Sequence, residues 1–319
     1  MSSTDLPVFS FGTLLNPRVQ EHLFGHTVHA QPTELADHDV VDVPILDPAV
    51  IAASGKDVHP GVVRRIRRSV AGALLPLDAQ QLAAADAYEV AAYARRRTLT
   101  RTPGATETRP AWAYLSANPL AVAQRIAVIG DSIAYGRASL DGGWAAALGA
   151  WHVGREEAEH RLYQLAYPGT TIRRIIQHIL PELTARRADT VLISAGINDL
   201  LLDGTSPREL VELVQRLCAD LEAEGMRPVV LGPTWLDAQR VRTVLGHEVD
   251  PDLVREHRER LAAWARQTHR DHLDPWPVLE GHPERVRADG LHPDAEGHRM
   301  LARWLLGLAQ GPAEDWQPA

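Results

Sequence analysis

The sequence is poor in cysteine and contains no long apolar segment. Cys218 is the only cysteine, which excludes an internal disulfide and a cysteine-based metal cluster. It lies beside the apolar face of a predicted helix, so we expect it to pack in a core rather than act as a nucleophile. No apolar run reaches the ~20 residues that a membrane-spanning helix needs. The first residues also lack the basic and apolar regions of a secretory leader, which favours a cytoplasmic location.

Positive charge is also in deficit. The chain has 33 Lys and Arg against 41 Asp and Glu, a net charge of −8, so we expect neither nucleic acid nor a membrane as a partner. The 15 histidines create some metal-like spacings by chance, and none of these sets is a complete zinc site. We therefore predict no metal ion and no cofactor. The sets in question are His22 with His26, and His269 and His272 with Asp271 and Asp274.

The length of 319 residues is enough for about two domains of roughly 150 residues. Up to residue 115 the pattern is one of short strands and turns, with a helix over 78–89. Strands are predicted at 8–11, 62–63, 70–74 and 97–100, and a short helix starts at 16–18. The pattern stops at the Asn118-Pro119 turn. We predict a first domain over 1–117, a linker over 118–124, a second domain over 125–312 and a tail over 313–319.

In the second domain strands and helices alternate. Buried strands are predicted at 126–129, 190–193 and 228–231. A helix between the last two begins with Ser206 and Pro207 and ends at Gly225. Alternation of this kind predicts a parallel sheet with helices on both faces. In such sheets the site lies at the carboxyl ends of the strands.

Four polar or glycine-bearing blocks occur in this domain, two of them directly after predicted strands. Because parallel strands end at the same edge of a sheet, the topology brings the first and third blocks together. The fourth block, near the end of the chain, can reach over that edge. In chain order the blocks are Gly130-Asp131-Ser132, Ala166-Tyr167-Pro168-Gly169-Thr170, Gly196-Ile197-Asn198-Asp199 and Asp289-Gly290-Leu291-His292-Pro293.

The residue types in these blocks suit nucleophilic catalysis. A serine hydroxyl attacks a carbonyl only when a base takes its proton, and His292 can be that base for Ser132. Asp289 can orient the imidazole and stabilise its charged form. The tetrahedral intermediate needs hydrogen-bond donors for its oxyanion. The backbone N–H groups of Ser132 and Gly169 and the side-chain amide of Asn198 are candidates.

In this order the four blocks resemble the SGNH, or GDSL-type, hydrolase family, over residues 125–310. The resemblance implies a flavodoxin-like three-layer α/β fold and an acyl-serine intermediate, with either hydrolysis or transfer of the acyl group. It assigns Ser132, Gly169, Asn198 and His292 the roles described above, and Asp289 that of the acidic partner. The strand-to-helix turn that carries the serine of α/β-hydrolases requires Gly-x-Ser-x-Gly. Here Ala134 occupies the position of the last glycine, which disfavours that rival fold. Asp131 and Asp199 have a catalytic alternative, but we favour turn-stabilising roles that bond nearby backbone.

The first domain resembles the AIG2-like branch of the γ-glutamylcyclotransferase superfamily, over nearly all of residues 6–115. The motifs that carry this resemblance are 9–14, 59–63, 70–74, 86–89, Tyr93, Arg95 and 111–114. It implies an α+β fold built on a β-barrel, in which the backbone of Phe11, Gly12, Thr13 and Leu14 binds the glutamyl carboxylate. It also implies that Glu89 is the general acid and base in a reaction that releases 5-oxoproline and an amine.

Two positions depart from that family's pattern and bear on how a substrate fits. Phe11 stands where tyrosine is usual, and Val90 follows Glu89 where glycine is usual. The Gly12 turn, which precedes a helix, is a suitable anion nest. The alternative for this domain is a binding module in which Glu89 is merely an exposed acid at a helix end.

Together the two domains predict a bifunctional enzyme acting on a small-molecule ester and a γ-glutamyl amide, with the two reactions as consecutive steps on one metabolite. A second hypothesis is an esterase or acyltransferase whose first domain only binds a substrate or partner. A third is a pair of degenerate domains used for assembly. The sequence leaves the acyl group, the alcohol, the amine and the oligomeric state open.

Overall fold

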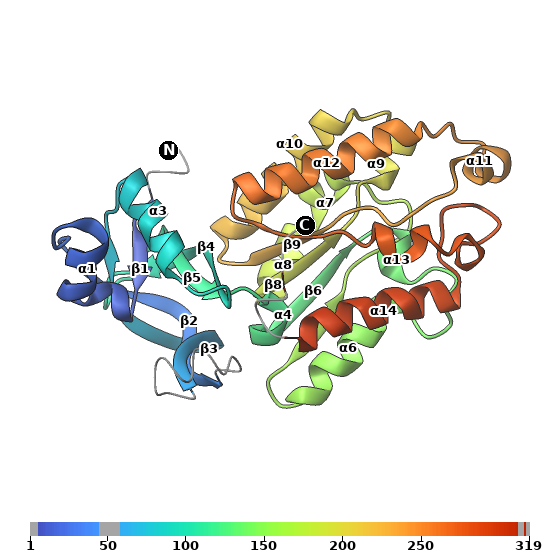
Figure 1. Cartoon of the computed structure of the whole chain (residues 1–319). Coiled ribbons are helices and arrows are strands. Elements are labelled where there is room, and N and C mark those ends of the chain that lie inside the picture. Colours follow the sequence, from blue (N-terminus) through green and yellow to red (C-terminus); the bar gives the residue numbers. More distant parts are fainter. Residues whose placement is uncertain (1–5, 45–57, 312–315, 317–319) are drawn as a thin grey trace. The chain divides into compact units, whose positions relative to one another are not determined.

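A computed structural model describes residues 6–44, 58–311 and 316 of the chain (Figure 1). The predicted tail over 313–319 lies outside the described residues, apart from Trp316. The chain forms two compact units, the first reaching to Ala123 and the second beginning at Gln124. The segment expected as a linker contains a short helix, α4 (Pro119–Val122), which Asn118 caps through its side chain.

The first unit is built on a closed five-stranded barrel. Its strand order is β1-β3-β2-β4-β5, and β5 closes the barrel by pairing in parallel with β1, whereas the other pairs are antiparallel. This confirms the predicted α+β barrel. The strands are β1 (Val8–Ser10), β2 (Gln31–Pro44), β3 (Val58–Leu75), β4 (Tyr93–Arg101) and β5 (Thr108–Ser116).

Alternation along the strands gives this unit two hydrophobic clusters. Phe9, Leu35, Val62 and Leu115 belong to one cluster. The neighbouring Val8 belongs to another, which also includes residues of the two helices. Those helices are α1 (Pro17–Phe24), capped by Asn16, and α3 (Ala79–Tyr88), which begins with a reciprocal capping box between Asp78 and Gln81.

The two strands predicted at 62–63 and 70–74 are parts of one strand, β3. The register between β2 and β3 shifts between Ala36 and His38. Asp37 and Arg67 both have positive φ, and the Arg67 N–H donates to Asp37 Oδ1 at 2.8 Å. This bulge lets the strand pair continue past an irregularity that, in the sequence, looks like a break.

The second unit contains a five-stranded parallel sheet with the order β10-β9-β8-β6-β7. The strands predicted at 126–129, 190–193 and 228–231 lie within β6, β8 and β9. The parallel α/β fold expected for this unit is therefore confirmed. The strands are β6 (Arg125–Gly130), β7 (Arg161–Gln164), β8 (Thr190–Ser194), β9 (Arg227–Leu231) and β10 (Asp271–Leu273).

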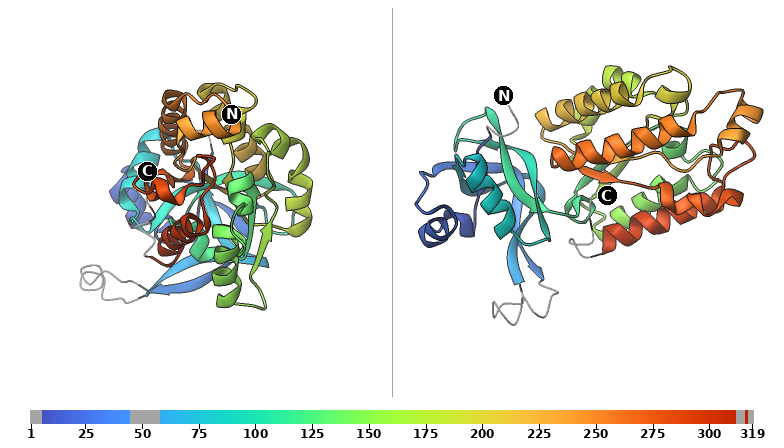
Figure 2. Two further views of the ribbon diagram at one scale, coloured as in Figure 1. Left: turned by 90° about the vertical axis from the view of Figure 1, so that its right-hand side faces the viewer. Right: turned by 45° about the horizontal axis from the view of Figure 1, so that its top comes forward.

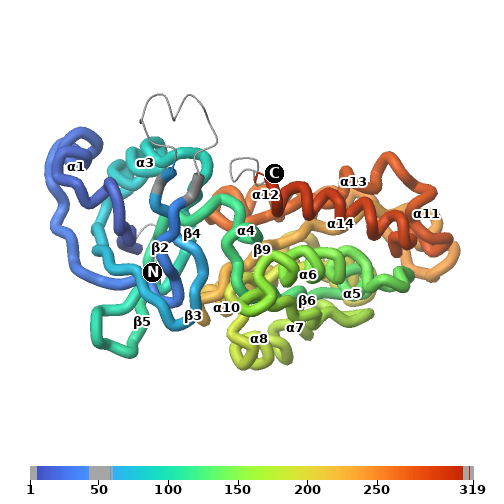
Figure 3. Tube along the Cα trace, turned by 90° about the horizontal axis from the view of Figure 1, so that it is seen from below, coloured from blue at the N-terminus to red at the C-terminus, as the bar shows by residue number. Residues whose placement is uncertain are grey.

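Helices cover both faces of this sheet (Figures 1 and 2). On one face α6 (Gly143–Arg155) and α14 (Ala295–Gln310) pack side by side (Figure 3). On the other lie α7 (Ile172–His178), α10 (Pro207–Ala223) and α12 (Pro251–Gln267). The shorter elements are η1 (Thr13–Leu15), α5 (Ser132–Tyr135), α8 (Leu180–Arg186), α9 (Ile197–Leu201), α11 (Ala238–Arg240), η2 (Val241–Leu245), α13 (Trp276–Glu280) and η3 (Pro283–Arg285).

The main core of the second unit fills the space between the sheet and the helices α7, α10 and α12. Cys218 is fully buried there, and burial raises the pKa of its thiol. The side chain therefore packs in the core, as predicted, and is not poised as a nucleophile. In the described part of the chain, no helix combines the length and apolarity required to cross a bilayer.

Candidate active sites

The carboxyl ends of β6 and β8 lie side by side and position the first candidate site. Gly130 pairs with Ser194, and the Asp131 N–H donates to the Ser194 carbonyl at 3.1 Å. The Tyr167 N–H donates to the Gly130 carbonyl at 3.0 Å, which holds the second block, residues 166–170, against the same edge. A Cβ on Gly130 would lie 2.1 Å from the Ser194 carbonyl oxygen. Only glycine allows this close approach two residues before Ser132.

Ser132 and His292 meet at this edge although 160 residues separate them. The Ser132 Oγ and His292 Nε2 atoms are 2.8 Å apart, and both side chains are buried. His292 Nδ1 is 2.9 Å from Asp289 Oδ2. The other carboxylate oxygen of Asp289 accepts from the N–H groups of Leu291 and His292, at 3.0 Å each. The structure therefore places the three residues in one continuous hydrogen-bonded chain.

The surroundings of this chain favour the protonation states that nucleophilic catalysis needs. Burial lowers the pKa of His292 below its ordinary value, although Asp289 acts in the opposite direction. Burial by itself would raise the pKa of Asp289, but hydrogen bonds from two N–H groups and the imidazole lower it. At neutral pH the imidazole can therefore accept a proton, while the carboxylate stays charged.

The three candidate oxyanion donors come from different segments. Ser132 is the first residue of α5, and N–H groups in a first helical turn have no intrahelical acceptor. Gly169 adopts a left-handed conformation with φ 77°. The Asn198 side chain donates through Nδ2 to the Thr170 carbonyl at 2.9 Å, which sets its amide beside the Gly169 turn. A primary amide has two N–H groups, so this contact leaves one for a substrate.

Asp131 and Asp199 have different structural roles. Asp131 Oδ1 accepts from the Ile133 N–H at 2.9 Å and caps α5, which is the turn-stabilising role expected. Asp199 reaches further than the expected nearby backbone. Its two oxygens accept from the Ile172 N–H at 3.1 and 3.0 Å, and this joins α9 to the start of α7. Burial raises the pKa of Asp131 to about 7 and that of Asp199 to about 6.

His298 contacts the loop that follows α5, the helix that begins at Ser132. This role was not assigned from the sequence. Its Nε2 atom is 3.0 Å from the Arg137 carbonyl oxygen, and the Arg137 N–H donates to the Ser132 carbonyl at 2.9 Å. A Cβ on Gly143 would lie 2.9 Å from His298 Nδ1. Gly143 and His298 lie 155 residues apart in the sequence, so their contact depends on the packing of α6 against α14.

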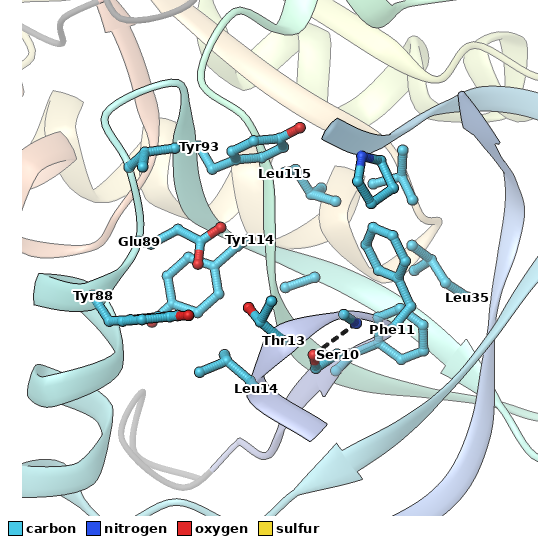
Figure 4. Close-up of a pocket in the computed structure, with 16 residues that line it drawn as sticks. Ser10, Phe11, Thr13, Leu14, Leu35, Tyr88, Glu89, Tyr93, Tyr114 and Leu115 are labelled. Atoms are coloured by element: carbon cyan, nitrogen blue, oxygen red, sulfur yellow. Dashed lines mark hydrogen bonds between the residues drawn. The ribbon is translucent and has the colours of Figure 1, made fainter. Parts of the chain in front are cut away.

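A second candidate site occupies a cavity of about 380 Å³ in the barrel unit. Figure 4 shows Glu89 on one side of this cavity and Phe11 and Leu35 on the other. The four residues predicted to bind substrate lie in its wall. The lining residues are Phe9, Ser10, Phe11, Gly12, Thr13, Leu14, Leu35, Pro60, Val62, Tyr88, Glu89, Val90, Tyr93, Ala113, Tyr114 and Leu115.

Glu89 ends helix α3 and directs its carboxylate into this cavity (Figure 4). Its side chain is partly buried. The alternative, in which Glu89 is an exposed acid at a helix end, is therefore wrong about its exposure. Burial raises the pKa of Glu89 above its ordinary value. The neighbouring Tyr93 has its pKa raised to about 12 by burial and by the Glu89 charge.

An ion pair behind Glu89 holds the end of α3. Asp86 accepts from Arg95 Nε at 2.8 Å and Nη2 at 2.9 Å, and also from the Tyr114 hydroxyl at 2.8 Å. The Arg95 guanidinium lies 4.8 Å from the centre of the buried Trp112 ring. All four residues occur in the motifs of the sequence, yet only the structure shows that they brace the helix carrying Glu89.

The turn after β1 forms another part of the cavity wall. Thr13–Leu15 is a single 3₁₀ turn, so the N–H groups of Thr13 and Leu14 lie in its first turn, which has no internal acceptor for them. The Gly12 N–H already donates to Ser10 Oγ at 3.3 Å. A substrate carboxylate would therefore compete with the Ser10 hydroxyl for the Gly12 N–H. Phe11 stacks on Phe9, with ring centres 6.5 Å apart, and adds an apolar surface.

The histidines with metal-like spacing take ordinary structural positions. His22 lies in α1, and His26 Nε2 is 3.3 Å from the Gln81 side-chain amide. His272 lies buried in β10. Among the described residues, no three His, Cys, Asp or Glu side chains converge in the way that metal ligands do.

Comparison with solved structures finds similar chains for the second unit. Axe2, an acetylxylan esterase from Geobacillus stearothermophilus, is 19% identical with a TM-score of 0.47, and the match covers 60% of this chain and 95% of Axe2. TesA is 22% identical with a TM-score of 0.49, covering 59% and 98%. A lipolytic protein of the G-D-S-L family from Veillonella parvula is 19% identical with a TM-score of 0.46, covering 57% and 96%. Comparison with curated proteins gives no match.

Two family models match the sequence. The model of γ-glutamyl cyclotransferase, AIG2-like, matches residues 8–144, which include the whole barrel. The model of the GDSL-like lipase/acylhydrolase family matches residues 128–300, which include Ser132 and His292 and exceed half of the 319 residues. The chain belongs to the GDSL-like lipase/acylhydrolase family and joins that hydrolase domain to an AIG2-like barrel.

Proposed function

We propose that this protein is a bifunctional enzyme that cleaves a small-molecule ester at Ser132 and a γ-glutamyl amide at Glu89. The hydrogen-bonded chain from Ser132 through His292 to Asp289 carries the first activity. The barrel cavity with Glu89 in its wall supports the second. Because the two sites occur in one chain, we further propose that they act consecutively on one metabolite.

In the ester reaction His292 takes the hydroxyl proton of Ser132 as the oxygen attacks the ester carbonyl. The negative charge that develops on the carbonyl oxygen is stabilised by the N–H groups of Ser132 and Gly169 and by the Asn198 amide. His292 then gives its proton to the departing alcohol, which leaves an acyl-Ser132 ester. Water or a second alcohol attacks this ester by the same steps in reverse order, giving hydrolysis or acyl transfer.

In the cyclotransferase reaction the α-amine of the glutamyl group attacks its own γ-carbonyl carbon. The C–N bond to the amine breaks, a five-membered lactam forms, and the products are 5-oxoproline and the free amine. The α-amine attacks in its neutral form. Glu89 takes the proton that this nitrogen loses as the new C–N bond forms and delivers it to the leaving nitrogen. A pKa raised by burial suits this task, because the carboxyl group must both accept and donate near neutral pH.

The cavity wall also supports a particular class of amine. A glutamyl group held at the Gly12 turn beside Glu89 leaves the rest of the cavity for the amine. Phe11, Leu35 and Leu115 are among the apolar side chains of this wall. An apolar substituent would gain roughly 25 cal/mol for each Å² that it buries there. We therefore propose γ-glutamyl amides of alkyl or aryl amines as substrates.

Both activities can be tested on the full-length protein. A fluorophosphonate probe should label Ser132, and peptide mapping should locate the adduct. A panel of γ-glutamyl amides should release 5-oxoproline, with alkyl and aryl amides ahead of γ-glutamylglycine. Labelling without 5-oxoproline release from any amide would favour an esterase with a binding module. Absence of labelling would contradict the ester reaction itself.

Removal of one oxyanion donor should slow the ester reaction strongly. We expect Asn198→Ala to lower kcat for 4-nitrophenyl acetate by a factor of about 10²–10³, because the amide acts mainly on charge that develops in the transition state. The measurement is steady-state kinetics, with Gln215→Ala on the exposed side of α10 as a control for an amide deletion. A change in kcat smaller than threefold would show that the Asn198 amide does not stabilise the oxyanion.

The pH profile should reveal the lowered pKa of His292. Protonated His292 cannot act as the base, so kcat/KM for 4-nitrophenyl acetate should fall with decreasing pH and reach half its plateau below pH 6.5. In Asp289→Asn the midpoint should move lower still, because the carboxylate that stabilises the imidazolium is gone, while the plateau rate drops. A midpoint above 6.5 in the parent, or an upward shift in the variant, would contradict this assignment.

A further inference from the structure

Two exposed arginines stand beside the Ser132–His292 pair, and each is tied to it by the backbone. The Arg137 N–H donates to the Ser132 carbonyl, and the Arg287 N–H donates to the His292 carbonyl, each at 2.9 Å. Their own carbonyl groups are also engaged, with His298 for Arg137 and the Gly290 N–H for Arg287. The backbone of both arginines is therefore held in place relative to Ser132 and His292.

Within the described residues, neither guanidinium has a hydrogen-bond or ion-pair partner, and both side chains are exposed. Several other arginines of the same unit are neutralised locally, as Arg227 is by Asp271 at 2.6 Å. Asp289, the acid nearest to Arg287 in the sequence, is occupied by the His292 imidazole and two backbone N–H groups. Two positive charges without a partner thus lie near enough to His292 to act on its imidazole.

These charges disfavour a positive charge on His292 unless the substrate balances them. Both guanidinium groups lower the pKa of His292, which means that they disfavour the imidazolium formed when Ser132 attacks. An anionic group of the substrate, placed between the arginines, would offset this repulsion and add charge-assisted hydrogen bonds. The arrangement therefore suits an acidic ester better than a neutral one.

We propose that Arg137 and Arg287 form an anion-binding subsite next to Ser132, and that the natural substrate is an ester bearing a carboxylate or a similar acidic group. This inference rests on the proposed ester hydrolysis at Ser132. It adds a substrate class, and it makes the two arginines residues that determine specificity.

The test compares esters that differ only in charge, on the full-length protein at pH 8 and low ionic strength. At this pH His292 is deprotonated in the parent and in the variants, so a difference in its protonation state does not enter the comparison. On the alcohol side the pair is 4-acetoxybenzoate and 4-acetoxybenzamide. On the acyl side it is 4-nitrophenyl 4-carboxybenzoate and 4-nitrophenyl 4-carbamoylbenzoate, whose rigid rings keep the charged group away from the ester carbonyl. The two pairs report separately on which part of the ester carries the anion.

We expect the parent to prefer the anionic member of at least one pair by about 10-fold in kcat/KM, and this ratio to shrink as salt is added. Arg137→Gln and Arg287→Gln should each reduce the ratio, and the double variant should bring it to about one. Arg216→Gln, an exposed arginine on α10, serves as the matched control and should leave the ratio unchanged.

Two results would overturn the inference while leaving the ester reaction intact. One is a parent that hydrolyses the neutral esters as well as or better than the anionic ones. The other is a preference for the anion that survives in the double variant. Absence of hydrolysis of all four esters, together with failure of a fluorophosphonate to label Ser132, would instead remove the proposed function on which the inference rests.

Discussion

Ser132→Ala should abolish ester hydrolysis with little effect on the fold. We expect kcat/KM for 4-nitrophenyl acetate to fall by a factor on the order of 10⁴–10⁶, because the acyl-enzyme can no longer form. The substitution removes one oxygen from a buried site, and the helix α5 that begins at this residue is still capped by Asp131. The change therefore acts on the chemistry rather than on packing.

The measurement is initial-rate kinetics with the thermal midpoint of unfolding as a check on the fold. Ser139→Ala, in the loop that follows α5, is the matched control and should retain the parent rate. Release of 5-oxoproline from a γ-glutamyl amide that contains no ester should continue in Ser132→Ala. Retention of more than a tenth of the parent esterase rate would show that Ser132 is not the nucleophile.

Glu89→Gln should eliminate the release of 5-oxoproline without affecting the ester reaction. Glutamine keeps the size of the side chain but cannot carry a proton from the attacking amine to the leaving nitrogen. We expect 5-oxoproline release to fall by a factor of about 10²–10⁴, with esterase activity unaffected. The partly buried position of Glu89, facing the cavity, is the physical reason for so large an effect.

The assay follows 5-oxoproline by mass spectrometry over a panel of γ-glutamyl amides. Glu21→Gln, an exposed acid on helix α1 of the same unit, controls for the loss of one negative charge. If Glu89→Gln releases 5-oxoproline as fast as the parent, another group moves the proton. If neither protein releases any while both cleave esters, the barrel serves to bind a substrate or a partner.

Together these two variants separate the activities within one chain. Each should lose one reaction and keep the other, because the proposed catalytic groups belong to different compact units. A metabolite that carries both an acyl ester and a γ-glutamyl amide would then reveal whether the reactions are consecutive. Accumulation of a different half-processed product in each variant would be the expected result.

Local patterns in the sequence determined much of the fold, because they act over short distances. The apolar runs at 126–129 and 190–193 predicted the strands that directly precede the segments with Ser132 and Asn198. Asp78 with Gln81 marked the start of α3, and Gly225, with φ 76°, follows the end of α10. Hydrophobic periodicity and helix capping depend on neighbours within a few residues, so they can be read without the tertiary structure.

Tertiary structure decided the contacts between distant segments and the environment of each polar group. Residue types and order nominated Ser132 and His292, but their 2.8 Å contact across 160 residues requires the folded sheet. The reach of Asp199 to Ile172 has no local signal. The burial of Glu89 and the unpaired charges of Arg137 and Arg287 also have no local signal in the sequence. Burial and ion pairing depend on which segments pack together in space.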